Sequence, residues 1–146
     1  MKEEIAILCT HNFGKLKKVL QKENSWSDFD MDFELELTLF LGKYIDGVVQ
    51  SEEKDWHNYI HKKLSWSSLH VSLLAQKINQ EPKYDLDLFK IAPQHGEFAE
   101  FLYANLLAIY LADGKVSQEE QNFLAQIRQH FFPLGSQKAE VIEQKF

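Results

Sequence analysis

Two aspartates, Asp46 and Asp113, stand where apolar helices are expected to end, and each is followed by glycine. The partial negative charge at a helix C-terminus disfavours a carboxylate by roughly 0.3–1 kcal/mol, so each aspartate needs a compensating partner. The exposed amides at the start of the following helix are the favoured partner. A bound divalent cation, shared with Glu53 or Glu120, is the alternative. The spacing does not match an EF-hand, which needs oxygen ligands at alternating positions of a twelve-residue loop.

A second set of possible metal ligands is a histidine pair. His57 and His61 lie four residues apart on one expected helix, a spacing at which two imidazoles bind a transition metal. The glutamate that follows the first histidine in metalloproteases is missing, which argues against peptidase activity. A third ligand would have to come from elsewhere, with His11, His70 and Glu53 as candidates. Exposed or packing histidines are the favoured interpretation, and a metal-binding pair is the alternative.

Acidic and apolar residues alternate from Asp28 to Leu37, a pattern that taken alone predicts a strand. Beyond it, the apolar spacing from Phe33 to Tyr44 is helical, so we expect a helix from about Asp32 to Tyr44. Its acidic residues are favoured as a solvated face at the helix start, and an acidic-aromatic docking surface for a basic protein is the alternative. The residues of that surface are Asp28, Asp30, Asp32, Glu34 and Glu36.

Motifs for catalysis are missing from the chain. It has no Ser-His-Asp ordering, P-loop, Rossmann glycine pattern or zinc-binding cysteine set. The pairs Glu52-Glu53 and Glu119-Glu120 are adjacent on expected helices, where consecutive side chains point about 100° apart and do not face one substrate. The sequence therefore favours a non-enzymatic protein, with a metal-dependent hydrolase the least supported alternative.

Composition fits one helical domain. Of 146 residues, 45% are hydrophobic and 26% charged, and six glycines and three prolines leave little material for a turn-rich β protein. The net charge of −6 argues against nucleic acid as a partner, and the lysines between Lys15 and Lys22 are expected to form a solvated face. The single cysteine, Cys9, predicts a buried, inert thiol. The apolar run 98–112 is too short to insert into a membrane, and we expect a cytoplasmic protein.

The elements that must position these residues are helices. We expect them over residues 2–23 (with 5–9 as an alternative strand), 32–44, 51–64, 68–79, 85–92, 96–112, from about 117 through Phe131, and after Ser136. Helix 96–112 is apolar nearly all round and should be central. The prediction is a single compact all-α domain.

A repeat joins the two Asp-Gly turns. With a constant offset of 67 residues, the residues Asp46, Gly47, Val49, Glu52, Glu53 and Ile60 recur as Asp113, Gly114, Val116, Glu119, Glu120 and Ile127. Ser117 and Glu120 have the spacing of a capping box. The repeat predicts two helix–turn–helix units around the central helix.

The segment Ala112-Asp113-Gly114-Lys115-Val116-Ser117-Gln118-Glu119-Glu120, followed by Phe123-Leu124, resembles the signature of TerB-like domains, named after tellurite-resistance proteins. Residues 45–53 are a degenerate second copy, because Ile45 replaces the usual alanine. The resemblance covers roughly Phe33 to Phe131. It implies an all-helical fold and a divalent cation, Ca²⁺ or another, bound through Asp46, Glu53, Asp113 and Glu120. It also divides the chain into an N-terminal extension, 1–30, and a TerB-like domain, 31–146.

The resulting functional expectation is a non-enzymatic interaction or sensing module of a bacterial stress or defence system, with a protein partner. The alternative is a small acidic inhibitor or immunity-type protein that engages a basic protein. The sequence does not indicate the oligomeric state.

Overall fold

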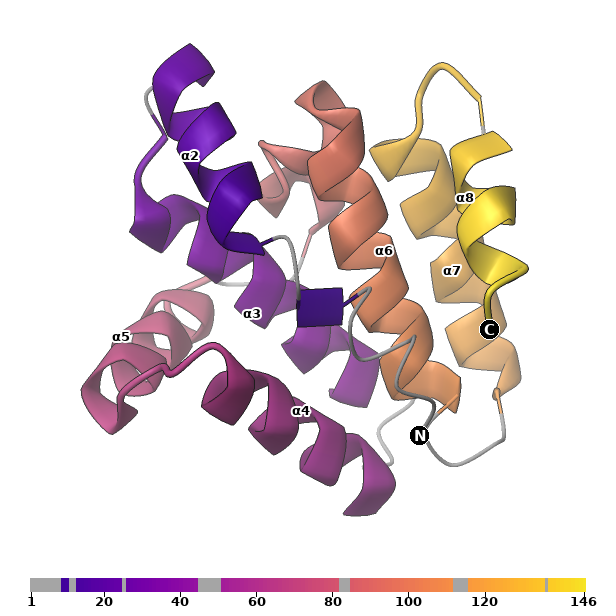
Figure 1. The fold of residues 1–146 in the computed structure, drawn as a ribbon. Coiled ribbons are helices and arrows are strands. Elements are labelled where there is room, and N and C mark those ends of the chain that lie inside the picture. Colours follow the sequence, from indigo (N-terminus) through magenta and orange to yellow (C-terminus); the bar gives the residue numbers. More distant parts are fainter. Residues whose placement is uncertain are drawn as a thin grey trace.

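The computed structural model describes residues 9–10, 13–24, 26–44, 51–81, 85–111, 116–135 and 137–146. Within these ranges the chain forms seven α-helices and two short 3-10 helices and contains no strand, which confirms the all-α prediction (Figure 1). The elements are α2 (Phe13–Asn24), α3 (Asp28–Tyr44), α4 (Ser51–Lys63), α5 (Ser68–Asn79), η1 (Leu86–Leu88), η2 (Ala92–Gln94), α6 (Gly96–Leu111), α7 (Gln118–Phe131) and α8 (Gln137–Glu143).

Helices α3 and α6 form the centre of the domain, with α4 and α5 on one side and α7 and α8 on the other (Figure 1). Helix α6 is buried at every position from Phe101 to Tyr110, as its apolar sequence predicts. The two central helices approach closely at Gly42, where an added Cβ atom would lie 3.0 Å from Cγ2 of Ile109. The glycine thus lets the backbone of α3 pack directly against side chains of α6.

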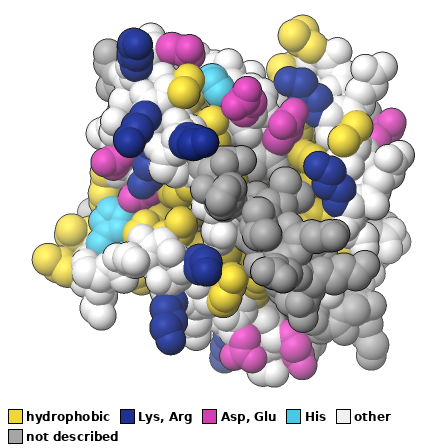
Figure 2. Space-filling view, in the orientation of Figure 1, with side chains coloured by type: hydrophobic (Ala, Val, Ile, Leu, Met, Phe, Trp, Pro, Cys, Tyr) yellow, Lys and Arg dark blue, Asp and Glu magenta, His cyan; other side chains and the backbone are white. Residues whose placement is uncertain are grey.

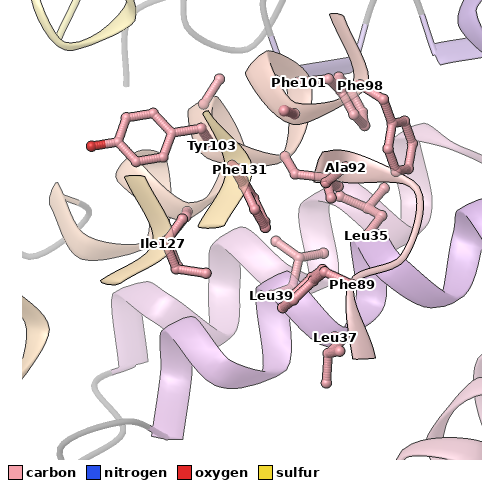
Figure 3. Close-up of a cluster of buried hydrophobic side chains, with 14 of the residues drawn as sticks. Leu35, Leu37, Leu39, Phe89, Ala92, Phe98, Phe101, Tyr103, Ile127 and Phe131 are labelled. Carbon is pink, nitrogen blue, oxygen red and sulfur yellow. The ribbon is translucent and has the colours of Figure 1, made fainter. Parts of the chain in front are cut away.

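The core is rich in aromatic rings contributed by several elements (Figure 3). Phe89, in the segment between η1 and η2, meets Phe131 of α7 edge to face, with ring centroids 5.0 Å apart. Phe13 of α2 stacks on Phe101 of α6 at 4.8 Å, so α2 belongs to the same core as the rest of the domain. These contacts join α2, α6, α7 and the segment between η1 and η2 in one core.

Two expectations about secondary structure need correction. Helix α3 begins at Asp28, one turn earlier than expected, because Asp30 and Ser27 cap its first turn: the Ser27 amide donates to Asp30 and the Asp30 amide donates to the Ser27 hydroxyl. Residues 85–92 do not form one short helix. Asp85 caps only the single 3-10 turn η1, and a second turn, η2, begins at Ala92.

The remaining described helices follow the sequence closely. Helix α5 has the expected bounds and its first turn is capped by Ser67, and α8 buries Ala139 and Ile142. The last residues of α3 and α6, Tyr44 and Leu111, are 67 positions apart, and so are the first residues of α4 and α7, Ser51 and Gln118. The helix boundaries therefore keep the offset of the sequence repeat.

Cys9 is fully buried, and burial raises the pKa of its thiol to about 12, as expected for an inert cysteine. Its carbonyl accepts a hydrogen bond from the amide of Asn105, a buried polar residue in the middle of α6. Among the described helices, none is both long enough and apolar enough to span a bilayer.

Candidate metal centre

Helix α3 carries three carboxylates in the protein interior. Asp32, Glu34 and Glu36 have exposed fractions of only 3%, 3% and 4%. A carboxylate transferred from water to such an environment costs several kcal/mol unless charged or hydrogen-bonding groups compensate it. Each of the three therefore needs its own partners, and the structure supplies a different kind to each.

Asp32 is held by two cationic or potentially cationic side chains. The ammonium of Lys17, on α2, lies 2.5 Å from Oδ1, and Nε2 of His70, on α5, lies 2.8 Å from Oδ2. Both partners are partly exposed. The Asp32 carboxylate thus connects α3 to α2 and α5.

Glu34 accepts hydrogen bonds from three backbone amides. Its Oε2 accepts hydrogen bonds from the N–H groups of Lys90 and Ile91 at 3.2 and 2.8 Å, and Oε1 accepts one from Ala92 at 3.1 Å. Burial raises the pKa of Glu34 to about 7, although these three bonds favour the ionised form. This carboxylate fixes the turn between η1 and η2 against α3.

Glu36 faces two imidazoles of α4. Oε1 of Glu36 accepts hydrogen bonds from Nε2 of both His57 and His61, the latter at 2.8 Å. Burial acts to raise the pKa of the Glu36 carboxyl, but the two histidine bonds outweigh it and hold the pKa at about 2. Burial lowers the pKa of His57, as does the nearby ammonium of Lys43, while Glu36 raises it.

These three side chains form the one group in the described part of the chain whose donor atoms could hold a metal ion. One ligand atom from each of Glu36, His57 and His61 lies within 4.8 Å of the other two. Zinc–ligand distances of about 2.0–2.1 Å place the donors of a tetrahedral site roughly 3.3 Å apart. The His61 and Glu36 donors would therefore have to separate by roughly 0.5 Å from 2.8 Å to admit an ion, and the His57 and Glu36 donors, which are closer together, by more.

The local sequence of α4 explains this arrangement. Residues four apart lie one above the other on a helix, so His57 and His61 project from the same face, with ring centroids 4.3 Å apart. Trp56 and Ile60 anchor α4 in the core. Trp66, just after α4, covers the His61 ring at 5.3 Å. The imidazoles are thereby held against α3.

A cavity of about 300 Å³ adjoins the three donors, between α3, α4 and α5. All three donor residues line it, together with Lys43 and Tyr44 of α3. Tyr44 is 47% exposed, so the cavity lies next to the surface at this end of α3. A metal ion at this position would have open space on one side.

The four acidic residues implied by the TerB resemblance do not all fall in the described part of the chain. Asp46 and Asp113 lie outside it. Glu53 and Glu120 are buried, each in the first turn of its helix. Glu120 forms the expected capping box with Ser117: its Oε1 accepts from the Ser117 amide at 2.8 Å, and its own amide donates to the Ser117 hydroxyl at 3.1 Å.

The expected acidic surface is only partly at the surface. Asp32, Glu34 and Glu36 are buried with partners inside the chain, so the expectation that they lie on a solvated or docking face is wrong. Asp28 and Asp30 remain accessible, and their role toward a partner stays a prediction. On the face seen in Figure 2, acidic and basic side chains are interspersed rather than gathered by sign.

Glu36 is the third possible ligand beside His57 and His61, and the sequence alone did not connect it with that pair. Of the expected third ligands, His70 binds Asp32 instead, Glu53 is not part of the group, and His11 lies outside the described residues. The sequence does contain an indication that Glu36 is buried. Once α3 is read as a helix apolar on all sides, Glu36 must be buried and must find a partner such as an imidazole.

Comparisons with protein-family models, with curated proteins and with solved structures found no match to this chain.

Proposed function

We propose that this protein is a non-enzymatic helical module that binds one divalent transition-metal ion through Glu36, His57 and His61. The observation that carries the proposal is the convergence of a buried carboxylate and two imidazoles from two helices, with donor atoms within 4.8 Å of one another. Two histidines and one carboxylate are a ligand set that occurs in zinc and non-haem iron sites.

The chemistry of the donors favours particular ions. Imidazole nitrogen suits Zn²⁺, Fe²⁺, Co²⁺, Ni²⁺ and Cu²⁺, whereas Ca²⁺ and Mg²⁺ take oxygen ligands almost exclusively. With two of three donors being nitrogen, the site favours Zn²⁺ or a similar ion over Ca²⁺. A calcium ion at the Asp-Gly turns, as the TerB resemblance implies, would be a separate site.

Metal binding at this position would act on the packing of α4. Glu36 belongs to α3 and both histidines belong to α4, so an ion would replace hydrogen bonds between the two helices by coordination bonds. A metal-dependent change in how firmly α4 is held is the response expected of a sensing or interaction module. The repeated helix boundaries support the further proposal of a TerB-like architecture of two helix–turn–helix units, in a bacterial stress or defence setting.

Thermal unfolding with and without metal tests the proposal. An ion at a hundred times its dissociation constant stabilises the folded state by about 2.7 kcal/mol. For a chain of this size that corresponds to a rise in Tm of roughly 5–10 °C. We expect this rise with Zn²⁺ or Co²⁺, reversal by EDTA, and little change with Ca²⁺ or Mg²⁺.

The variants Glu36→Gln, His57→Gln and His61→Gln should each lose the metal-dependent rise, measured against the same variant without metal. His70→Gln is the matched control, because His70 also binds a buried carboxylate of α3 but lies outside the donor group. It should keep the full rise. A wild-type protein whose Tm is unmoved by every transition metal, or a rise that survives in the three variants, would show that the cluster is only a structural contact.

A further inference from the structure

The cavity beside Glu36, His57 and His61 has features that the proposed metal ion alone does not use. Three protein donors fill three positions of a tetrahedral ion, and catalytic zinc sites leave the fourth to water or an added ligand. Since all three donor residues line the cavity, the unfilled position of an ion held there has room for such a ligand. The chemistry of the other lining residues then indicates which ligand fits.

Charge in this region favours an anion. Lys43 lines the cavity three residues after Phe40 on α3, and its ammonium is near enough to act on both Glu36 and His57. Glu53 and Lys54 also act on the Lys43 ammonium, and their opposite charges offset each other. A divalent ion, the single negative charge of Glu36 and the positive charge of Lys43 would leave the site with a net positive charge to be balanced.

The other residues that line the cavity favour an anion that carries a hydrocarbon group. Phe40 of α3 and Val71, Ala75 and Ile78 of α5 line the side of the cavity formed by α3 and α5. A volume of about 300 Å³ is at the small end of ligand sites, suited to a ligand of several non-hydrogen atoms. A bare inorganic anion would leave this apolar surface in contact with water.

We propose that the metal ion at Glu36, His57 and His61, together with Lys43, binds a short-chain carboxylate whose hydrocarbon part packs between Phe40, Val71 and Ile78. This proposal rests on the proposed metal-binding function. The carboxylate would occupy the open metal position and form an ion pair with Lys43. Asn58 and Asn79, which also line the cavity, offer amide hydrogen bonds near the ligand.

Cobalt substitution provides the test, because the visible absorption of Co²⁺ reports changes in its ligands. The full-length protein loaded with Co²⁺ would be titrated with acetate, butyrate, hexanoate, sulfate and phosphate. We expect the visible bands to shift with the carboxylates, at concentrations that fall from acetate to hexanoate. Each buried methylene contributes about 0.8 kcal/mol, so butyrate should bind at least about tenfold more tightly than acetate.

Variants identify the residues. Lys43→Met should weaken butyrate binding by about tenfold or more, the loss expected for one charged hydrogen bond, with Co²⁺ affinity nearly unchanged. Lys43→Arg should restore most of it. Lys63→Met is the matched control, because Lys63 is an exposed lysine of α4 that does not line the cavity, and it should behave as wild type.

The outcomes separate the two proposals. A protein without cobalt bands overturns both. Cobalt bands that no carboxylate changes overturn the ligand proposal and leave metal binding standing. Equal responses to acetate, hexanoate and phosphate also overturn it, since they indicate an adventitious anion on the metal rather than a carboxylate held by the apolar wall.

Discussion

Glu34 offers a sharp test of how burial and hydrogen bonding compete in this domain. Its carboxylate accepts three backbone amides, which favour the ionised form, yet it is 3% exposed and burial raises its pKa to about 7. The change we consider is Glu34→Gln. Glutamine is neutral at every pH, and its carbonyl replaces only one of the two accepting oxygens, so the variant loses part of the hydrogen bonding at all pH values.

The sign of the pH dependence follows from linkage. The folded chain holds the Glu34 proton up to about pH 7, whereas the unfolded chain releases it near 4.5, so the folded state binds more protons between these values. Stability contributed by the wild-type residue is therefore fully present below pH 4.5 and is lost as the pH rises to 7. The difference between 4.5 and about 7 corresponds to about 3 kcal/mol of unfolding free energy. Glutamine has no such loss.

Urea unfolding of wild type and Glu34→Gln from pH 4 to pH 8 measures this difference. We expect the variant to be the less stable protein at pH 4. Between pH 4 and pH 8, the unfolding free energy of the variant should rise relative to that of the wild type by about 3 kcal/mol. Contributions from Glu36 and His57 cancel when the two proteins are compared. A stability advantage of the wild type that stays constant with pH would mean that the three amides offset burial, and one that grows with pH would mean that they outweigh it. Either result would refute the reasoning.

Two predictions concern the packing and capping that position the site. Gly42→Val should lower the free energy of unfolding by about 1–3 kcal/mol in urea titrations, because even a Cβ atom there would lie 3.0 Å from Ile109. A neutral or stabilising result would show that α3 and α6 separate at little cost. Ser117→Ala should cost about 1 kcal/mol by removing one half of the capping box with Glu120, and Ser117→Thr should retain most of the stability in the same assay. Equal losses in both would contradict the capping role.

Local patterns allowed much of the fold to be predicted. The Ser67 cap and the Glu81-Pro82 break set the bounds of α5, and the Ser117 and Glu120 spacing set the start of α7, because each depends on residues within a few positions. The start of α3 was misplaced, since the alternation of acidic and apolar residues obscured the cap formed by Ser27 and Asp30. An alternation of acidic and apolar residues with a period of two does not distinguish a strand from a helix that has apolar residues on every side.

The candidate site was harder to predict because it depends on contacts across the fold. The amides that hold Glu34 come from residues 90–92, and the imidazoles that hold Glu36 come from the next helix, α4. An acidic residue on a helix is most often exposed, so solvation was the favoured interpretation of the whole run. Only the packing of α3 among its neighbours shows that three of the five acidic residues between Asp28 and Glu36 are buried.

The positions of the three buried carboxylates around α3 explain why one of them differs from the others. Residues four apart lie on the same side of a helix, so Asp32 and Glu36 both face the histidine-bearing helices α4 and α5, while Glu34 faces the turn at η2. Asp32 has one histidine and one lysine on separate oxygens, which is sufficient to balance a single buried charge. Glu36 has two imidazole nitrogens on the same oxygen, beside a cavity, an arrangement that Asp32 lacks. A metal ion would bind to these converging donor atoms, which is the reason to look for function at Glu36 rather than at Asp32 or Glu34.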